Sequence, residues 1–322
     1  MIDLIIPAYN AEDTIGRALA SVAAQTKQRK FLITVIDDCS TDNTAAIVNK
    51  FKGILPIKYI KLKKNLGKPG LVRNIGIERT TCPYIMFLDA DDMLMPMAAE
   101  LLSRASLQYR PDIIFGQFLV EFPGVKEEEK YELYGTDKIT WLHGNLYSRK
   151  FLKNNGIMFD DNLNEDGSFN LKSIKLAQTI YKIEQPISIW CHNEKSITRS
   201  NKDFLIGIGE DYIKTYSDAI KFILKKRPEQ ANRSDFREIC GLRLAEFFEY
   251  IDAYLYYGKN TDKLLYLVDD YVTFIKKYDI VDKNFIEATN ERFNDFKFFP
   301  NMRRQQVIGT YFSTFKIDSK EE

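Results

Sequence analysis

The chain has 322 residues, more than the ~250–300 at which a single hydrophobic core stops growing, so its length predicts two domains. Its 46 Lys and Arg residues balance 45 Asp and Glu residues, a net charge of +1 that gives no field to attract nucleic acid, and we expect no nucleic-acid partner. No run of about 18 apolar residues occurs, so we expect a cytoplasmic protein with at most peripheral membrane contact.

The first third of the chain alternates short apolar runs with helical patterns. It begins with a strand and not with a secretion signal, because no basic segment precedes the apolar stretch and Pro7 follows it at once. The predicted strands are 4–6, 32–36, 57–60 and 84–88, and the predicted helices are 11–24, 44–51 and 71–79. This alternation predicts an α/β fold with a mostly parallel sheet and helices on both faces.

Polar residues follow each of these strands. They occupy 7–10, 37–38, 65–70 and 89–92. Ligands bind beyond the carboxyl ends of such strands, so we expect a nucleotide and a divalent cation at this edge of the sheet. Each group alone has a simpler explanation, and 38–42 is also typical of helix capping before Thr44.

The pattern changes after Asp92. We predict helices at 96–109, 149–155 and 165–177, a long strand at 112–120, and a closing hairpin with strands 179–183 and 186–190. These elements complete a catalytic domain, residues 1–203. The remainder, 204–322, predicts a smaller all-helical domain with helices at 205–225, 236–257 and 261–278. Its aromatic stripes are typical of a packed core, and the alternative is a surface for acceptor binding or homo-oligomer formation.

Four ordered motifs, at 4–10, 36–42, 70–76 and 87–92, resemble the family 2 inverting glycosyltransferases with a GT-A fold. The resemblance covers about the first two hundred residues and not the helical remainder. The lysine-rich lead into Asn65 and the helical tail are also similar to bacterial wall teichoic acid glycosyltransferases. The resemblance implies a UDP-sugar donor, a Mn²⁺ or Mg²⁺ ion, and transfer to a hydroxyl of a bacterial or phage-related glycan, such as a polysaccharide or a polyol phosphate.

Five residues are candidates for the nucleotide site. Tyr9 can lay its ring against a base, and the Asp38 carboxylate can accept a hydrogen bond from N3–H of uracil; the resemblance assigns both residues to uracil. Pro7 and Asn65 lie at the ends of the first and third strands, and we expect both in this site. Arg73 is expected to cover a phosphate or the uracil edge, the alternative being a surface cation.

The cation site is predicted at Asp89 and Asp91. One spacer residue puts both carboxylates on the same side of an extended segment, and their oxygens suit a hard cation. We expect Asp91 to be the principal ligand and Asp89 to lie closer to the ribose or a metal-bound water. Asp92 is expected to cap the following helix. The resemblance adds His192, in a segment running to Thr198, as a diphosphate or metal contact. The alternative is an acidic turn without a metal.

The catalytic base is predicted at the start of the helix at 165–177. The resemblance implies that Asp166 deprotonates the acceptor, with Glu165 as its neighbour. The alternative is a carboxylate stabilised by the helix dipole. His143 resembles a family segment near the acceptor cleft, and we include it among the residues of the nucleotide-sugar site. Both His143 and His192 could instead have structural roles.

Two other functions are weighed against transfer. A sugar nucleotidyltransferase needs a Gly-rich, basic loop after the first strand, and 7–10 is not one. A non-catalytic nucleotide-sugar-binding or scaffold protein could lose Asp38, Asp91 or Asp166 without losing its core. All three are present, which favours an enzyme.

Overall fold

A computed structural model describes residues 1–26, 30–126, 129–135, 141–162, 164–194, 208–256 and 258–295. The chain separates into two compact units, Met1–Asn201 and Lys202–Glu322. The predicted boundary between 203 and 204 and the predicted helix start at 205 lie outside the described residues.

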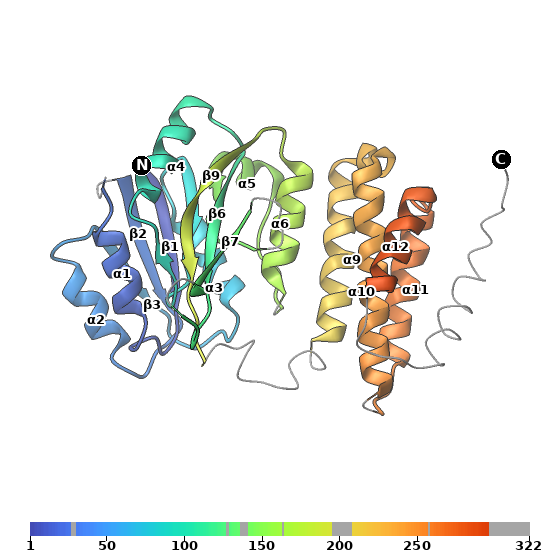
Figure 1. Ribbon diagram of the computed structural model, residues 1–322, viewed down its shortest axis with the longest axis horizontal. Coiled ribbons are helices and arrows are strands. Elements are labelled where there is room, and N and C mark those ends of the chain that lie inside the picture. The colour runs from blue at the N-terminus through green and yellow to red at the C-terminus, as the bar shows by residue number, and fades with distance from the viewer. Residues whose placement is uncertain are drawn as a thin grey trace. The chain divides into compact units, whose positions relative to one another are not determined.

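A single sheet organises the first unit (Figure 1). Its strands are β1 Ile2–Ala8, β2 Phe31–Asp37, β3 Ile57–Lys61, β4 Tyr84–Phe87, β5 Met93–Leu94, β6 Ile113–Glu121, β7 Tyr131–Tyr134, β8 Leu146–Ser148 and β9 Ile180–Trp190. Their order is β3-β2-β1-β4-β8-β6-β9-β5, and β7 pairs with β6. Strands β1 to β4 are parallel, as predicted. Beyond β4 the sheet is mixed, because β8 runs antiparallel to both β4 and β6.

Helices cover both faces of this sheet. They are α1 Ile15–Ala23, α2 Thr44–Phe51, α3 Pro69–Arg79, α4 Ala98–Gln108, α5 Arg149–Asn155 and α6 Glu165–Leu176. Side chains of β1 alternate between the faces. Leu4 and Leu19 belong to one buried cluster, whereas Ile5 faces α3 so closely that a Cβ at Gly76 would lie 2.5 Å from its Cγ2. The predicted α/β fold with helices on both faces is confirmed.

The predicted closing hairpin is wrong, because Ile180–Trp190 forms the single strand β9 beside β6. Gly116 pairs with Ile183 and the next residue, Gln117, pairs with Pro186, so a bulge takes up the two residues between them. Pro186 has no N–H for a ladder hydrogen bond, and a bulge tolerates it. The residues between Ile183 and Pro186, which we predicted to form the turn of a hairpin, therefore form a bulge within one strand.

The second unit is helical. It contains α9 Gly209–Lys226, the short 3₁₀ helix η3 Pro228–Asn232, α10 Ser234–Tyr256, α11 Asp262–Lys276 and α12 Lys283–Asp295. The first, third and fourth correspond to the three predicted helices, and α12 was not predicted. Phe247, Phe248 and Tyr271 are buried, so these aromatic residues form core, as expected. No helix in the described part of the chain is both long and apolar enough to cross a bilayer.

Candidate active site

The loops after β1 and β2 are joined at the carboxyl edge of the sheet. Asn10 and Cys39 have φ values of 45° and 67°, a left-handed backbone that is uncommon outside glycine. The Asn10 amide donates to Ser40 Oγ at 2.9 Å, and Asn10 Oδ1 accepts from the Thr41 amide at 2.9 Å. Beside this junction Tyr9 is 53% exposed. An exposed ring next to a fixed loop is available for stacking on a base.

Asp38 holds the loop that follows β3. Its carboxylate accepts from the Leu66 amide at 2.7 Å and from the Gly67 amide at 3.1 Å. Pro7 is buried in β1, and Asn65 is exposed in the middle of the loop between β3 and α3. A carboxylate has about four lone-pair sites, so Asp38 can still accept a hydrogen bond from a base. The sequence did not predict this anchoring role.

Neighbouring acids at the end of β2 are structural. Asp37 is fully buried and accepts from the Ser40 amide at 2.7 Å and from the Tyr59 hydroxyl. Asp42 accepts from the Thr44 amide at 2.9 Å, at the start of α2. Asp42 precedes Asn43, the N-cap residue of α2, and Asn43 makes no side-chain capping hydrogen bond, so the contact of Asp42 is a local turn before the helix and not a cap.

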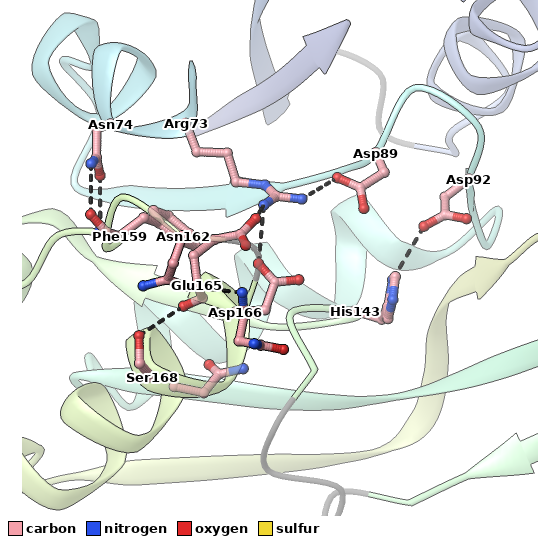
Figure 2. Close-up of polar contacts among 12 residues, drawn as sticks. Arg73, Asn74, Asp89, Asp92, His143, Phe159, Asn162, Glu165, Asp166 and Ser168 are labelled. Atoms are coloured by element: carbon pink, nitrogen blue, oxygen red, sulfur yellow. Dashed lines mark hydrogen bonds and ion pairs between the residues drawn. The ribbon is translucent and has the colours of Figure 1, made fainter. Parts of the chain in front are cut away.

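Arg73 joins three carboxylates from two distant parts of the chain (Figure 2). Its Nη2 lies 2.6 Å from Asp89 Oδ1, and its Nη1 lies 2.9 Å from Glu165 Oε1 and 3.0 Å from Asp166 Oδ1. The Arg73 side chain is 4% exposed and that of Glu165 is 7% exposed, whereas Asp89 and Asp166 are 34% and 35% exposed. Arg73 is thus no surface cation, and the two acids that are about one third exposed border the space in which ligands could bind.

The electrostatics of this cluster are set by burial and by the excess of acids. Burial acts to raise the pKa of Asp89, but the Arg73 guanidinium holds that pKa below its ordinary value. Burial raises the pKa of Asp166 despite Arg73, and burial together with Asp166 raises the pKa of Glu165 to about 7. Asp89 is therefore the acid most firmly ionised, and Asp166 binds a proton more readily than an ordinary aspartate.

The segment 89–92 is fixed by residues far along the chain. Asp91 Oδ2 accepts from Asn193 Nδ2 at 2.8 Å, and the Asp91 carbonyl accepts from Arg17 Nη2 at 2.7 Å. These contacts span 102 and 74 residues, and no local pattern in the sequence indicates either of them. Burial and the charge of Asp89 raise the pKa of Asp91, so a cation beside these two acids would be favoured.

Asp92 does not cap the following helix as predicted. The strand β5 intervenes, and α4 begins only at Ala98. Asp92 is buried, accepts from the Cys191 amide at 2.9 Å, and lies 3.2 Å from His143 Nδ1 (Figure 2). Burial raises the pKa of Asp92 to about 6. Burial acts to lower the pKa of His143, but its contact with Asp92 raises that pKa above the ordinary value.

Both histidines lie near this acidic loop. The His143 ring packs against the rings of Phe118 and Trp190, with centroid distances of 5.2 and 5.8 Å. The His192 amide donates to Glu121 Oε2 at 3.0 Å, and the residues on either side of His192 contact Asp92 and Asp91. The segment 191–193 therefore lies against the predicted cation loop. The rest of the predicted segment, from 195 to Thr198, lies outside the described residues.

The residues predicted to bind the cation do not supply a complete set of metal ligands. Within the part of the chain that the structure describes, no three His, Cys, Asp or Glu side chains are grouped so that they could hold a metal ion. Asp89 and Asp91 offer hard carboxylate oxygens, which suit Mg²⁺ or Mn²⁺ with most ligands supplied by water and substrate phosphate. The donor set fits a cation that binds together with a diphosphate.

The close approach of α3 to α6 depends on Gly70. A Cβ at this position would lie 2.6 Å from Glu165 Cγ and 2.9 Å from Phe159 Cβ. We expect Gly70→Ala to lower the free energy of unfolding by about 1–3 kcal/mol through overpacking, and to lower transfer because Glu165 must move. Gly53→Ala is the matched control, since a Cβ there meets nothing within 4 Å. Denaturant unfolding and initial rates measure both effects; equal results for the two variants would contradict this packing.

Comparison with known proteins identifies the family. The model of glycosyl transferase family 2 matches residues 3–164, half of the chain. The chain belongs to this family. The match begins in β1 and ends just before α6, so it includes the loops after β1, β2, β3 and β4 described above.

Several curated relatives act on poly(ribitol phosphate), according to their names. The beta-N-acetylglucosaminyltransferase TarP of Staphylococcus aureus is 34% identical over 126 residues, 38% of this chain and 38% of TarP. TarS of the same species is 28% identical over 192 residues, 55% of this chain and 33% of TarS. The poly(ribitol-phosphate) beta-glucosyltransferase of Bacillus spizizenii is 30% identical over 191 residues, 56% of this chain and 30% of that enzyme. The matches span only about a third of these relatives.

Solved structures share the fold. TarS residues 1–349 in complex with UDP-GlcNAc align with a TM-score of 0.66 at 20% identity, over 92% of this chain and 93% of that one. A mannosyltransferase from Pyrobaculum calidifontis in complex with GDP-Man and Mn²⁺ aligns with a TM-score of 0.53 at 15% identity, over 91% and 87%. The predicted GT-A fold followed by a helical region is confirmed.

Proposed function

We propose that this protein is a metal-dependent inverting glycosyltransferase that moves a sugar from a UDP-sugar to a hydroxyl of a surface glycan. The observation that carries the proposal is the cluster around Arg73. It brings Asp89, from the predicted cation loop, and Asp166, the predicted base, to one guanidinium at the carboxyl edge of the sheet. A transferase needs these two functions within the length of one sugar.

Support for a uridine donor comes from the loops after β1, β2 and β3. Tyr9 is exposed for stacking, and Asp38 keeps lone pairs for N3–H of uracil. Pro7 shapes the end of β1, and Asn65 lies on the loop that Asp38 holds. The similar fold of TarS is known with UDP-GlcNAc bound, which favours the same nucleotide here.

Asp91 and Asp89 would hold a Mn²⁺ or Mg²⁺ ion. His192 would contact the ion only after a rearrangement, since no three His, Cys, Asp or Glu side chains of the described residues are grouped to hold a metal. Burial and the charge of Asp89 raise the pKa of Asp91, and a bound cation would offset the repulsion between the two carboxylates. When bound, the ion would neutralise charge on the departing diphosphate.

The transfer itself is a single displacement. Asp166 lies in the first turn of α6 with a third of its side chain exposed, so an acceptor hydroxyl can reach it. The carboxylate takes the hydroxyl proton while the acceptor oxygen forms a bond to the anomeric carbon. The bond from that carbon to the UDP oxygen breaks on the opposite face, so configuration inverts and no covalent enzyme intermediate forms. Glu165 is held by Arg73 beside the base.

A polyol phosphate such as teichoic acid is the acceptor class that the relatives' names favour. We propose that residues 204–322 bind this acceptor or form a homo-oligomer, since the family match ends at residue 164.

Nucleotide preference tests the donor proposal. In the presence of Mn²⁺, UDP should bind about 5–100-fold more tightly than CDP, because cytosine presents an acceptor nitrogen where uracil presents N3–H to Asp38. Isothermal titration calorimetry with the full chain measures both affinities. Equal affinities would remove Asp38 from the uracil site, and no binding of either nucleotide would refute the proposed function.

A further inference from the structure

We infer that Arg73 is a positioning residue that fixes the base Asp166 relative to the donor-side carboxylate Asp89, and that it does not bind the nucleotide. This inference rests on the proposed function. It replaces the phosphate or uracil contact expected from the sequence with a role between side chains of the protein.

Both terminal nitrogens of Arg73 are already used by carboxylates. Nη2 contacts Asp89 at 2.6 Å, and Nη1 contacts Glu165 at 2.9 Å and Asp166 at 3.0 Å. The Phe159 ring lies 5.4 Å from the guanidinium carbon, and the side chain is 4% exposed. Nε and the second N–H of Nη2 have no acceptor among the described residues, but Nε is buried and little of the guanidinium surface is open to a phosphate.

The helix that carries Arg73 is locked to the segment before α6. Asn74 donates through Nδ2 to the Phe159 carbonyl at 2.9 Å and accepts through Oδ1 from the Phe159 amide at 2.9 Å (Figure 2). Ser168 Oγ donates to Asp160 Oδ2 at 2.5 Å, which ties Asp160 to α6. Arg73 thus stands on a rigid support when it reaches Asp166.

Asp89 belongs to a different part of the site, the loop after β4. Among the interactions of the described residues, the guanidinium is the group that contacts both this loop and the acids of α6. Its planar fork serves two directions at once, whereas a lysine ammonium acts as one point charge. The shape of the guanidinium, and not only its charge, therefore sets the distance between donor and base.

The test is Arg73→Lys, with Arg79→Lys as control, because Arg79 is an exposed residue of the same helix. At saturating Mn²⁺ and UDP-sugar we expect kcat to fall about 10²-fold for Arg73→Lys, the cost of a misplaced reacting group, and KM for the donor to stay within about threefold. Arg79→Lys should match the unaltered protein. A loss of donor affinity in step with kcat, or unchanged kcat, would overturn the inference.

If Arg73→Lys does not fold, a crystal structure of the unaltered protein with UDP and Mn²⁺ decides. The guanidinium should still contact Asp89 and Asp166 and no atom of UDP; a contact with the diphosphate or uracil would overturn the inference. Failure of the unaltered protein to bind UDP by calorimetry would instead refute the proposed function, and the inference with it.

Discussion

Replacing Asp166 with Asn should reduce sugar transfer by about 10²–10⁴-fold, the usual contribution of a general base, while UDP binding is retained. The amide cannot take the acceptor proton. Its oxygen can still accept a hydrogen bond from Arg73 Nη1, which lies 3.0 Å from the Asp166 carboxylate in the unaltered protein. UDP release in the presence of acceptor measures transfer, and calorimetry with UDP and Mn²⁺ measures binding.

Asp161→Asn is the matched control for this variant. Asp161 precedes α6 and is paired with Lys68, and its side chain is 68% exposed. The same isosteric change there should leave transfer within about twofold, since exposed ion pairs contribute little. Near-normal transfer by a folded Asp166→Asn protein would exclude Asp166 as the base.

The pH profile of the unaltered protein gives a second control. Burial raises the pKa of Asp166 despite Arg73, and the base works only when ionised. Transfer at saturating substrates should therefore fall as the pH drops through a value above the ordinary aspartate range. The Asp166→Asn variant should lack this decline.

Replacing Asp91 with Asn should abolish the metal dependence of UDP binding and reduce transfer by about 10³-fold, equivalent to about 4 kcal/mol of lost charge stabilisation. In the unaltered protein Asp91 Oδ2 accepts from Asn193 Nδ2 at 2.8 Å. The oxygen of the new amide can keep this contact, so the loop at 89–92 should stay in place. Calorimetry with UDP, with Mn²⁺ or with EDTA, compares the variant with the unaltered protein.

Treating the unaltered protein with EDTA should reproduce the Asp91→Asn affinity. If UDP binds the unaltered protein equally well with Mn²⁺ and with EDTA, the acids at 89 and 91 hold no cation with the donor.

The parallel half of the sheet could be predicted because each strand is marked by a short pattern of neighbouring residues. Each of β1 to β4 is an apolar run with a polar turn directly after it, and parallel pairing brings those turns to one edge. This reasoning selected Asp89, the family resemblance added Glu165 and Asp166, and the structure brings these three acids to Arg73.

Other features depend on pairings that the sequence does not display. Arg73 meets Glu165 across 92 residues, so its partners were not predictable, and its burial excludes only the alternative of a surface cation. Asp92 seemed suited to capping because the two-residue strand β5 is too short to detect as a periodic pattern. The turn-like residues before Pro186 form a bulge only because β6 lies beside them.

The most direct test of the account is the product of the reaction. The full chain should be incubated with a panel of UDP-sugars, Mn²⁺ and poly(ribitol phosphate), followed by measurement of UDP release and of the anomeric configuration of the product by NMR. We predict metal-dependent release of UDP from at least one donor, and a linkage of configuration opposite to that of the donor. A product that retains the donor's configuration, or consumption of none of the UDP-sugars, would contradict the account.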